Sequence, residues 1–181
     1  ETLEQFTYRA PVDRAFVSEL LQTLQKKGAK LIGVDLLFDK PTEPAKDAAL
    51  KHTLQNLRVP HFVSYSNSPE VVTEEQLAYL QAYVPEEMRA SAHLGSDPFD
   101  GSVRWILPGM DKPGLPMGFA YKALAMLGKP QPAQQVEINW KPGPDADTKP
   151  FPVYPAHALA LRQALGMVRR LTSEEERWRH E

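Results

Sequence analysis

A hydrophobic run rich in branched aliphatic residues covers residues 30–38, KLIGVDLLF. Nine residues are too few for an ordinary helix, so the run predicts a strand buried on both faces. A helical pattern precedes this run and ends at Gly28, a second one covers residues 44–57, and another apolar strand pattern follows at residues 61–65. Helices that alternate with short buried strands predict a layered α/β/α domain with a central, mostly parallel sheet.

Residues that start and stop helices support this pattern. Asp13 is placed to be an N-cap, and Gly28 is placed to end the same helix in a left-handed conformation. Thr73 and Gln76 have the spacing of a capping box, which predicts a further helix. The first helix is expected to bury an apolar stripe made of Phe16, Val17, Leu20, Leu21 and Leu24. The helix over residues 44–57 is expected to bury Ala48, Ala49, Leu50 and Leu54.

The second half of the chain has shorter apolar stretches. Residues 91–94 and 102–107 flank the turn sequence GSDPFDG and predict an antiparallel hairpin, with Gly101 at a positive φ. A helix is predicted from Phe119, and residues 135–140 alternate like a strand with one solvated face. The rest is expected to be a proline-rich loop over 141–155, a helix over 157–171 and an exposed helical tail over 171–181. A single domain is the simplest account of all 181 residues.

Composition excludes several classes of function. The formal net charge of −2 gives no electrostatic basis for binding nucleic acid or an anionic membrane. The absence of cysteine excludes a disulfide scaffold, thiol catalysis and a thiolate zinc site. No apolar run approaches the roughly 18–20 residues that a membrane span needs. The chain as given is therefore expected to be soluble, with any membrane anchors outside it.

Four carboxylates follow the 30–38 run, and two interpretations of them stay open. Asp35, Asp39, Glu43 and Asp47 could share a metal ion, because hard cations take several carboxylate oxygens. Alternatively, Asp39 and Asp47 could cap turns and helix starts, while Asp35 pairs with a nearby base. The haloacid dehalogenase pattern fails, since Asp35 is followed by Leu-Leu-Phe rather than by a second aspartate two residues on. A small metal-dependent α/β hydrolase or phosphatase that uses Asp35 and Asp39 remains the alternative function.

The sequence DPFDGSVR is the most distinctive polar string in the chain. Asp97, Asp100 and Arg104 could be offered to a ligand from an exposed loop. They could also hold a tight turn, with Asp100 accepting from backbone amides and Arg104 pairing with a carboxylate. The structural interpretation is the one we favour.

Other motifs with chemical meaning are missing. The chain has no nucleotide-binding glycine motif and no serine hydrolase elbow, and the scattered tryptophans suggest no platform for stacking bases. His93, beside a predicted strand, is expected to be a hydrogen-bonded core or rim side chain. No metal-ligand spacing occurs among the five histidines, which are His52, His61, His93, His157 and His180.

Two stretches of the chain resemble a known family. They are YRAPVDRAFVSELLQTLQKKGAKLIGVDLLFDKPTEPAKDAAL over residues 8–50 and SAHLGSDPFDGSVR over residues 91–104. Together they resemble the second family of CHASE-type extracellular sensor domains, which belong to bacterial membrane receptors. The matching positions are Arg9, Pro11, Asp13, Arg14, Gly28, Ala29, Ile32, Gly33, Asp35, Phe38, Asp39, Pro41, Asp47, Asp100, Gly101, Val103 and Arg104.

This resemblance implies a non-catalytic sensor in the periplasmic or extracellular portion of an inner-membrane protein, with no cofactor. The output module would be a histidine kinase, an adenylate cyclase, a diguanylate cyclase or a protein kinase, reached through membrane helices of the same chain. The family also has a strand before the position of Glu1 and another after the last helix. Both are missing from this sequence, so the sheet is expected to lack strands at both termini. Exposed edges of such a sheet would pair with a second copy, which predicts a homodimer.

A sensed molecule is expected to bind at the loops that follow the strands, because open α/β sheets hold their ligands there. The stimulus would be an unidentified small molecule or a protein. The candidate ligand-binding residues are Arg9, Asp35, Asp39, Asp100 and Arg104.

Overall fold

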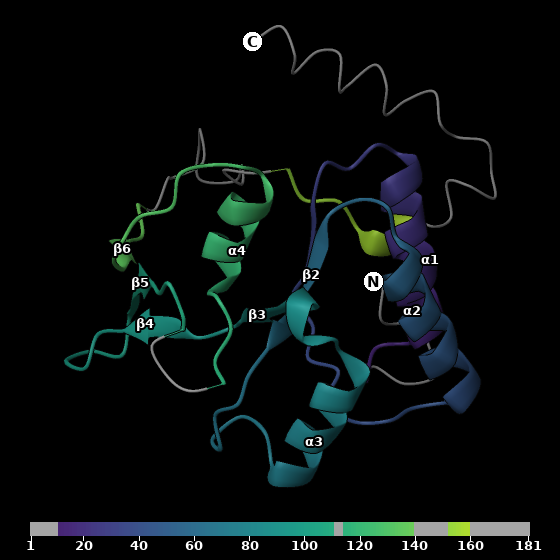
Figure 1. Ribbon diagram of the computed structural model, residues 1–181, viewed down its shortest axis with the longest axis horizontal. Helices are drawn as coiled ribbons and strands as arrows, with labels where there is room; N and C mark the ends of the chain where they lie inside the picture. Colours follow the sequence, from purple (N-terminus) through teal and green to yellow (C-terminus); the bar gives the residue numbers. More distant parts are fainter. Residues whose placement is uncertain (1–10, 111–113, 140–151, 160–181) are drawn as a thin grey trace, which may run out of the picture.

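The computed structural model describes residues 11–110, 114–139 and 152–159, and over these ranges the protein has an α/β fold (Figure 1). In this part of the chain, a parallel sheet has the strand order β1-β2-β3, with bounds Ile32–Val34, His61–Tyr65 and Arg89–Ser91. A smaller antiparallel sheet has the order β4-β5-β6, with bounds Leu94–Ser96, Val103–Ile106 and Val136–Glu137. The predicted α/β class with a parallel sheet is confirmed, but the antiparallel hairpin belongs to a second sheet and is not carried by the parallel one.

Helices lie on both faces of the parallel sheet. In Figure 1, β2 stands between the α1–α2 pair on one side and α4 on the other. The helices are α1 (Arg14–Lys26), α2 (Pro44–Asn56), α3 (Glu74–Tyr83) and α4 (Phe119–Met126), with a short 3-10 turn at Glu86–Met88. The layered arrangement expected from the alternating pattern is present in the described residues.

The helix ends follow the predicted chemistry. Asp13 accepts a hydrogen bond from the backbone N–H of Phe16 at 3.0 Å, which satisfies one of the free donors at the start of α1. Gly28 has a φ of 81°, the left-handed conformation that a side chain disfavours. The capping box of α3 is complete, since Thr73 and Gln76 exchange side-chain and backbone hydrogen bonds.

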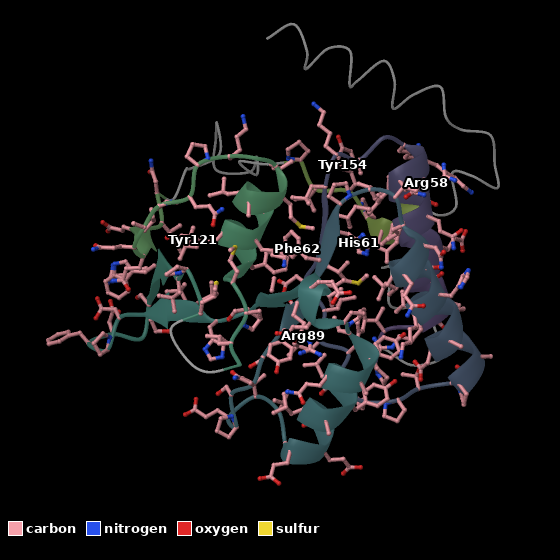
Figure 2. All side chains as sticks on the ribbon, in the orientation of Figure 1. Arg58, His61, Phe62, Arg89, Tyr121 and Tyr154 are labelled. Atoms are coloured by element: carbon pink, nitrogen blue, oxygen red, sulfur yellow. The ribbon has the colours of Figure 1, made fainter. Side chains whose placement is uncertain are left out.

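Strand β2 lies at the centre of the described parallel sheet and is buried along its whole length. Successive side chains of a strand point to opposite faces. His61 therefore faces α2, where its Nε2 lies 2.8 Å from the carbonyl oxygen of Leu54, while Phe62 faces α4 (Figure 2). The ring of Phe62 meets that of Phe119 edge to face, with centroids 4.6 Å apart. The main core fills the α1–α2 side and also takes in residues of α3.

The strand predicted over residues 30–38 is shorter than expected. Only Ile32–Val34 is a paired strand, and it lies at one edge of the sheet formed by the described strands, where its neighbour is β2. The chain leaves the sheet after Val34, and Phe38 packs into the core instead of continuing the strand. Phe38 is fully buried there, with its ring centroid 5.7 Å from that of Tyr83. The apolar pattern correctly predicted that residues such as Phe38 are buried, but it did not predict where strand pairing ends.

Other expectations need smaller corrections. The exposed side of α2 includes Ala48 and Ala49, which were expected to be buried. The strand predicted over residues 135–140 is reduced to β6, whose two residues are both exposed. Strand β3 was not predicted at all. The residues of α2 that are buried are Asp47, Leu50, Thr53 and Leu54.

The predicted hairpin and the helix predicted from Phe119 are confirmed. Strands β4 and β5 pair antiparallel, and Gly101 in the turn has a φ of 72°. Helix α4 begins at Phe119 as expected. Residues 156–159 are helical, but the rest of the helix predicted over 157–171, most of the 141–155 loop and the 171–181 tail lie outside the described residues. No helix in the described ranges is long and apolar enough to cross a membrane.

Candidate functional site

A cavity of about 250 Å³ lies between the two sheets, beyond the carboxyl ends of β1 and β3. This is the position at which open α/β sheets hold ligands. Its polar lining comes from the residues just after the parallel strands, and its apolar lining from the hairpin sheet and α4. The lining residues that matter for its chemistry are Asp35, Ser91, His93, Leu107 and Phe119.

Asp35, directly after β1, contributes a carboxylate to the lining of this cavity. One of its oxygens, Oδ1, accepts a hydrogen bond from the hydroxyl of Ser64 at 2.6 Å. Ser64 is almost fully buried on β2, so it holds the carboxylate in a fixed direction. Oδ2 accepts no hydrogen bond from another described residue and has capacity to bind a donor.

His93 carries a second polar group in the cavity wall. Its backbone N–H donates to the hydroxyl of Ser91 at 3.2 Å, but its ring nitrogen Nε2 is buried without a hydrogen bond among the described residues. Burial without a partner costs free energy. His61 differs in this respect, since both of its ring nitrogens lie within 2.9 Å of carbonyl oxygens. The expectation that His93 would be hydrogen-bonded is therefore wrong.

Backbone contacts that depend on glycine bring the apolar wall into place. Phe119 can reach β1 because Gly33 has no side chain; a Cβ there would lie 2.9 Å from the Phe119 ring. Gly118 donates its backbone N–H to Pro108 and packs so closely on Leu107 that a Cβ would lie 2.0 Å from the Leu107 carbonyl oxygen. These approaches join α4 to the loop after β5 and define the cavity between them.

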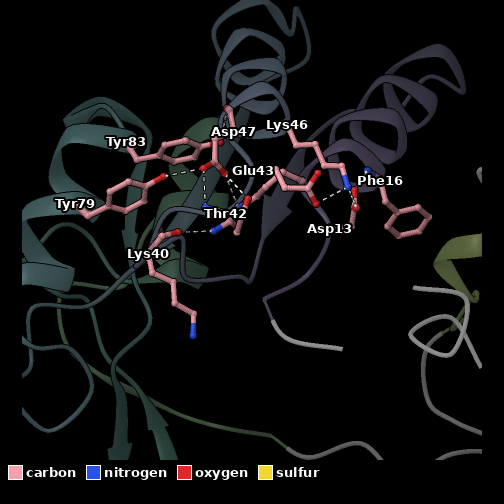
Figure 3. A network of polar contacts seen from close by, with 10 residues as sticks. Asp13, Phe16, Lys40, Thr42, Glu43, Lys46, Asp47, Tyr79 and Tyr83 are labelled. Atoms are coloured by element: carbon pink, nitrogen blue, oxygen red, sulfur yellow. Dashed lines mark hydrogen bonds and ion pairs between the residues drawn. The ribbon is translucent and has the colours of Figure 1, made fainter. Parts of the chain in front are cut away.

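A buried charged pair lies on the other side of the core, where α1, α2 and α3 meet. The side chain of Arg14 is 2 % exposed and its Nε lies 3.4 Å from Oδ1 of Asp47. Asp47 also accepts from the backbone N–H and the hydroxyl of Thr42, both at 2.7 Å (Figure 3). The guanidinium of Arg14 stacks over Phe38 at 4.2 Å and donates to the carbonyl of Lys40. This network fixes the loop after β1 against the three helices.

Tyrosines and a lysine complete the network shown in Figure 3. The hydroxyl of Tyr83 donates to the backbone carbonyl of Asp47 at 2.8 Å, and burial raises the pKa of this phenol. Burial also acts to raise the pKa of Asp13, but hydrogen bonds from Lys46 and from the Phe16 amide outweigh it and leave that pKa below its usual value. Asp13 therefore remains ionised as a helix cap.

Comparison with known proteins identifies the family. The CHASE2 domain model matches residues 1–174. The chain belongs to the CHASE2 family. CHASE2 domains are extracellular sensor domains of membrane receptors, so the resemblance found in the sequence is confirmed. No curated protein and no solved structure matches the chain.

The four carboxylates that follow β1 do not form one site in this CHASE2 domain. Asp39 accepts from the side-chain amide of Gln76 at 2.7 Å, Glu43 pairs with Lys46, and Asp47 holds Thr42 and Arg14. Among the described residues, no group of three or more histidines and acids could hold a metal ion. The expected basic partner of Asp35 is not found among the described residues, where Asp35 accepts from the Ser64 hydroxyl instead. Of the capping roles expected of Asp39 and Asp47, only that of Asp47 is seen: it accepts from the backbone of the turn before α2, whereas Asp39 binds a side-chain amide.

Asp39 lines a different cavity from Asp35. This second cavity has a volume of about 240 Å³, and its lining also includes Pro11, Arg14 and Lys40. Its arginine and its carboxylate are already engaged with Asp47 and Gln76. The structure thus separates two candidate ligand residues that the sequence placed together, while Arg9 lies outside the described residues.

The polar residues of the hairpin turn in this CHASE2 domain hold the turn together, as the favoured interpretation of the sequence predicted. Arg104 donates to Asp97 at 2.9 Å and to Asp100 at 2.5 Å, while the two aspartates accept from backbone amides of the turn. The backbone N–H of Ser102 is the largest cause of a lowered pKa for Asp100. All three side chains are engaged within the turn.

Two groups of the cavity were missed by sequence reasoning. Ser91 and Phe119 carry no motif, and neither stood out as a ligand residue. The only available signal was position, since Ser91 ends β3 and Phe119 begins α4. Using that signal would have required knowing from the sequence that β3 pairs with β2.

Proposed function

We propose that this CHASE2 domain is the extracytoplasmic sensor of a bacterial transmembrane receptor, and that a small molecule is its stimulus. Family membership is the observation that carries this proposal. The cavity between the two sheets supports a small-molecule stimulus, because it combines a fixed carboxylate with an apolar wall. A ligand there would contact the parallel sheet, the hairpin and α4 together.

Signal transfer would follow from that position. A ligand shifts an equilibrium between two packings only if it binds them differently. A molecule between Asp35 and Phe119 would favour one arrangement of α4 and the hairpin sheet over the parallel sheet. We propose that this change passes to membrane helices of the same chain in a homodimeric receptor, and then to a kinase or cyclase module.

The predicted ligand residues take different roles in this proposal. Asp35 contacts the stimulus directly. Asp39, Asp100 and Arg104 shape the loops around the strands, since their side chains already bind Gln76 or one another. The metal-dependent hydrolase alternative has no support from the described residues, because Asp35 and Asp39 do not share a site.

The location of the domain can be tested by chemical labelling in cells. The chain has no cysteine, and Phe99 at the hairpin tip is 99 % exposed, so Phe99→Cys introduces a single reactive thiol. In the intact receptor, a membrane-impermeant maleimide is expected to label this thiol in whole cells. Leu50→Cys, at a fully buried position, is the matched control and should react only after denaturation. Labelling of Phe99→Cys only after cell lysis would place the domain in the cytoplasm and contradict the proposal.

A further inference from the structure

We infer that the cavity between the sheets binds a small organic cation, an ammonium group attached to an apolar body. This inference rests on the proposed function, since it names the chemical class of the stimulus. It is carried by three properties of the cavity: the charge of its wall, the unused hydrogen-bonding capacity of Asp35, and the apolar surface opposite.

The charge of the wall selects against anions. Asp35 lines the cavity, and no lysine or arginine does so among the described residues. A carboxylate or phosphate ligand would meet a like charge there with no lysine or arginine in the described lining to offset it. A cation would gain an opposite charge at the same place.

The carboxylate of Asp35 is held ready for a donor. Its Oδ1 is held by the buried hydroxyl of Ser64 at 2.6 Å, so the group does not have to be ordered when a ligand arrives. The second oxygen can then accept from an ammonium group. Hydrogen bonds between two charged groups are among the strongest in proteins, which makes this contact the main polar anchor.

The remaining wall suits a short apolar body. It is formed by Leu94, Ile106, Leu107 and Phe119. The volume of about 250 Å³ lies below the roughly 300–1,000 Å³ of pockets for drug-sized ligands. The ligand is therefore of the size of a single metabolite, such as an aliphatic or aromatic amine, and not a peptide.

Three compounds of matched shape test the charge requirement. Phenethylamine, 2-phenylethanol and 3-phenylpropionate carry a cation, a neutral group and an anion on the same apolar body. Calorimetric titration of the purified chain is expected to show binding of phenethylamine and at least tenfold weaker binding of the other two. Asp35→Asn keeps an oxygen that can accept from Ser64 but removes the charge, and it should weaken phenethylamine binding about 10- to 100-fold. Asp39→Asn makes the same change at the other cavity and should leave the affinity unchanged.

Several results would overturn the inference. Equal binding of the amine and the propionate, or equal binding of phenethylamine to the wild type and Asp35→Asn, would show that the carboxylate does not select the ligand. Binding of the propionate alone would reverse the assigned charge. Absence of binding by all three would also reject the cation. None of these results alters the labelling of Phe99→Cys in cells, so failure of the inference can be told apart from failure of the proposed function.

Discussion

Replacing Asp47 by alanine is expected to lower the free energy of unfolding by about 3–5 kcal/mol, because it leaves the buried guanidinium of Arg14 without its counter-ion. The same change removes the acceptor for the backbone N–H and hydroxyl of Thr42. The loop after β1 would then lose its attachment to α2. Urea denaturation followed by circular dichroism measures the loss.

Two further variants isolate the cause. Asp100→Ala removes an acid that also binds an arginine and a backbone amide, but at an exposed hairpin tip, so its effect should be much smaller. Arg14→Met combined with Asp47→Ala removes both charges and should be more stable than Asp47→Ala alone. The account of the buried pair would be wrong if Asp47→Ala proved no more harmful than Asp100→Ala, or if the double variant lost the sum of both single effects.

Gly118→Ala is expected to destabilise the protein by about 3 kcal/mol or more, since overpacking against rigid backbone cannot be relieved by a change of rotamer. Gly118 has a φ of −58°, which any residue can adopt, so its conformation does not require glycine. The constraint is space, because a Cβ would lie 2.0 Å from the carbonyl oxygen of Leu107. The contact between α4 and the loop after β5 would have to open, which would also distort the cavity.

Gly128→Ala provides a control with the opposite properties. Gly128 has a φ of 64°, but no atom lies within 4 Å of the position that a Cβ would occupy. Alanine there costs only the strain of a left-handed residue, about 1–2 kcal/mol. Both variants can be compared by thermal and urea denaturation. If Gly118→Ala were as stable as Gly128→Ala, the close approach of α4 to Leu107 would not exist in solution.

Elements marked by local chemistry could be predicted from the sequence. Helix α1 begins at the Asp13 cap and ends before Gly28, and α3 begins with the Thr73 capping box, because these signals act within one helical turn. Strand β2 was predicted with its observed bounds, because a short run with the apolar residues Phe62, Val63 and Tyr65 directly follows Pro60.

Elements that depend on distant partners could not be predicted. Strand β3 has the sequence Arg-Ala-Ser, which has no strand pattern; it is a strand because it pairs with β2 and because Arg89 binds the carbonyls of Val84 and Gln81. The length of β1 was overestimated for a related reason. Apolar residues such as Phe38 indicate burial, but burial in a sheet and burial under a helix leave the same pattern.

The candidate site was predictable only in part. Asp35 was found because a polar residue directly after a buried strand is a general sign of a ligand position. Asp39 was grouped with it because the strand was assumed to continue, whereas the chain turns toward α3 and brings Asp39 to Gln76. His93 and Phe119 join Asp35 only through the packing of the hairpin and α4 on the parallel sheet, which no local pattern encodes.

The most direct test of the central claim is to block the cavity in the intact receptor and measure the activity of its output module. Ala120→Leu adds side-chain volume to the cavity wall, and Ala48→Leu makes the same change on the exposed side of α2. If the cavity receives the stimulus, the output of the Ala120→Leu receptor will not respond to a compound that binds the wild-type domain, while the Ala48→Leu receptor responds normally. A normal response from Ala120→Leu, with the variant folded and present in the membrane, would contradict the claim that sensing occurs between the two sheets.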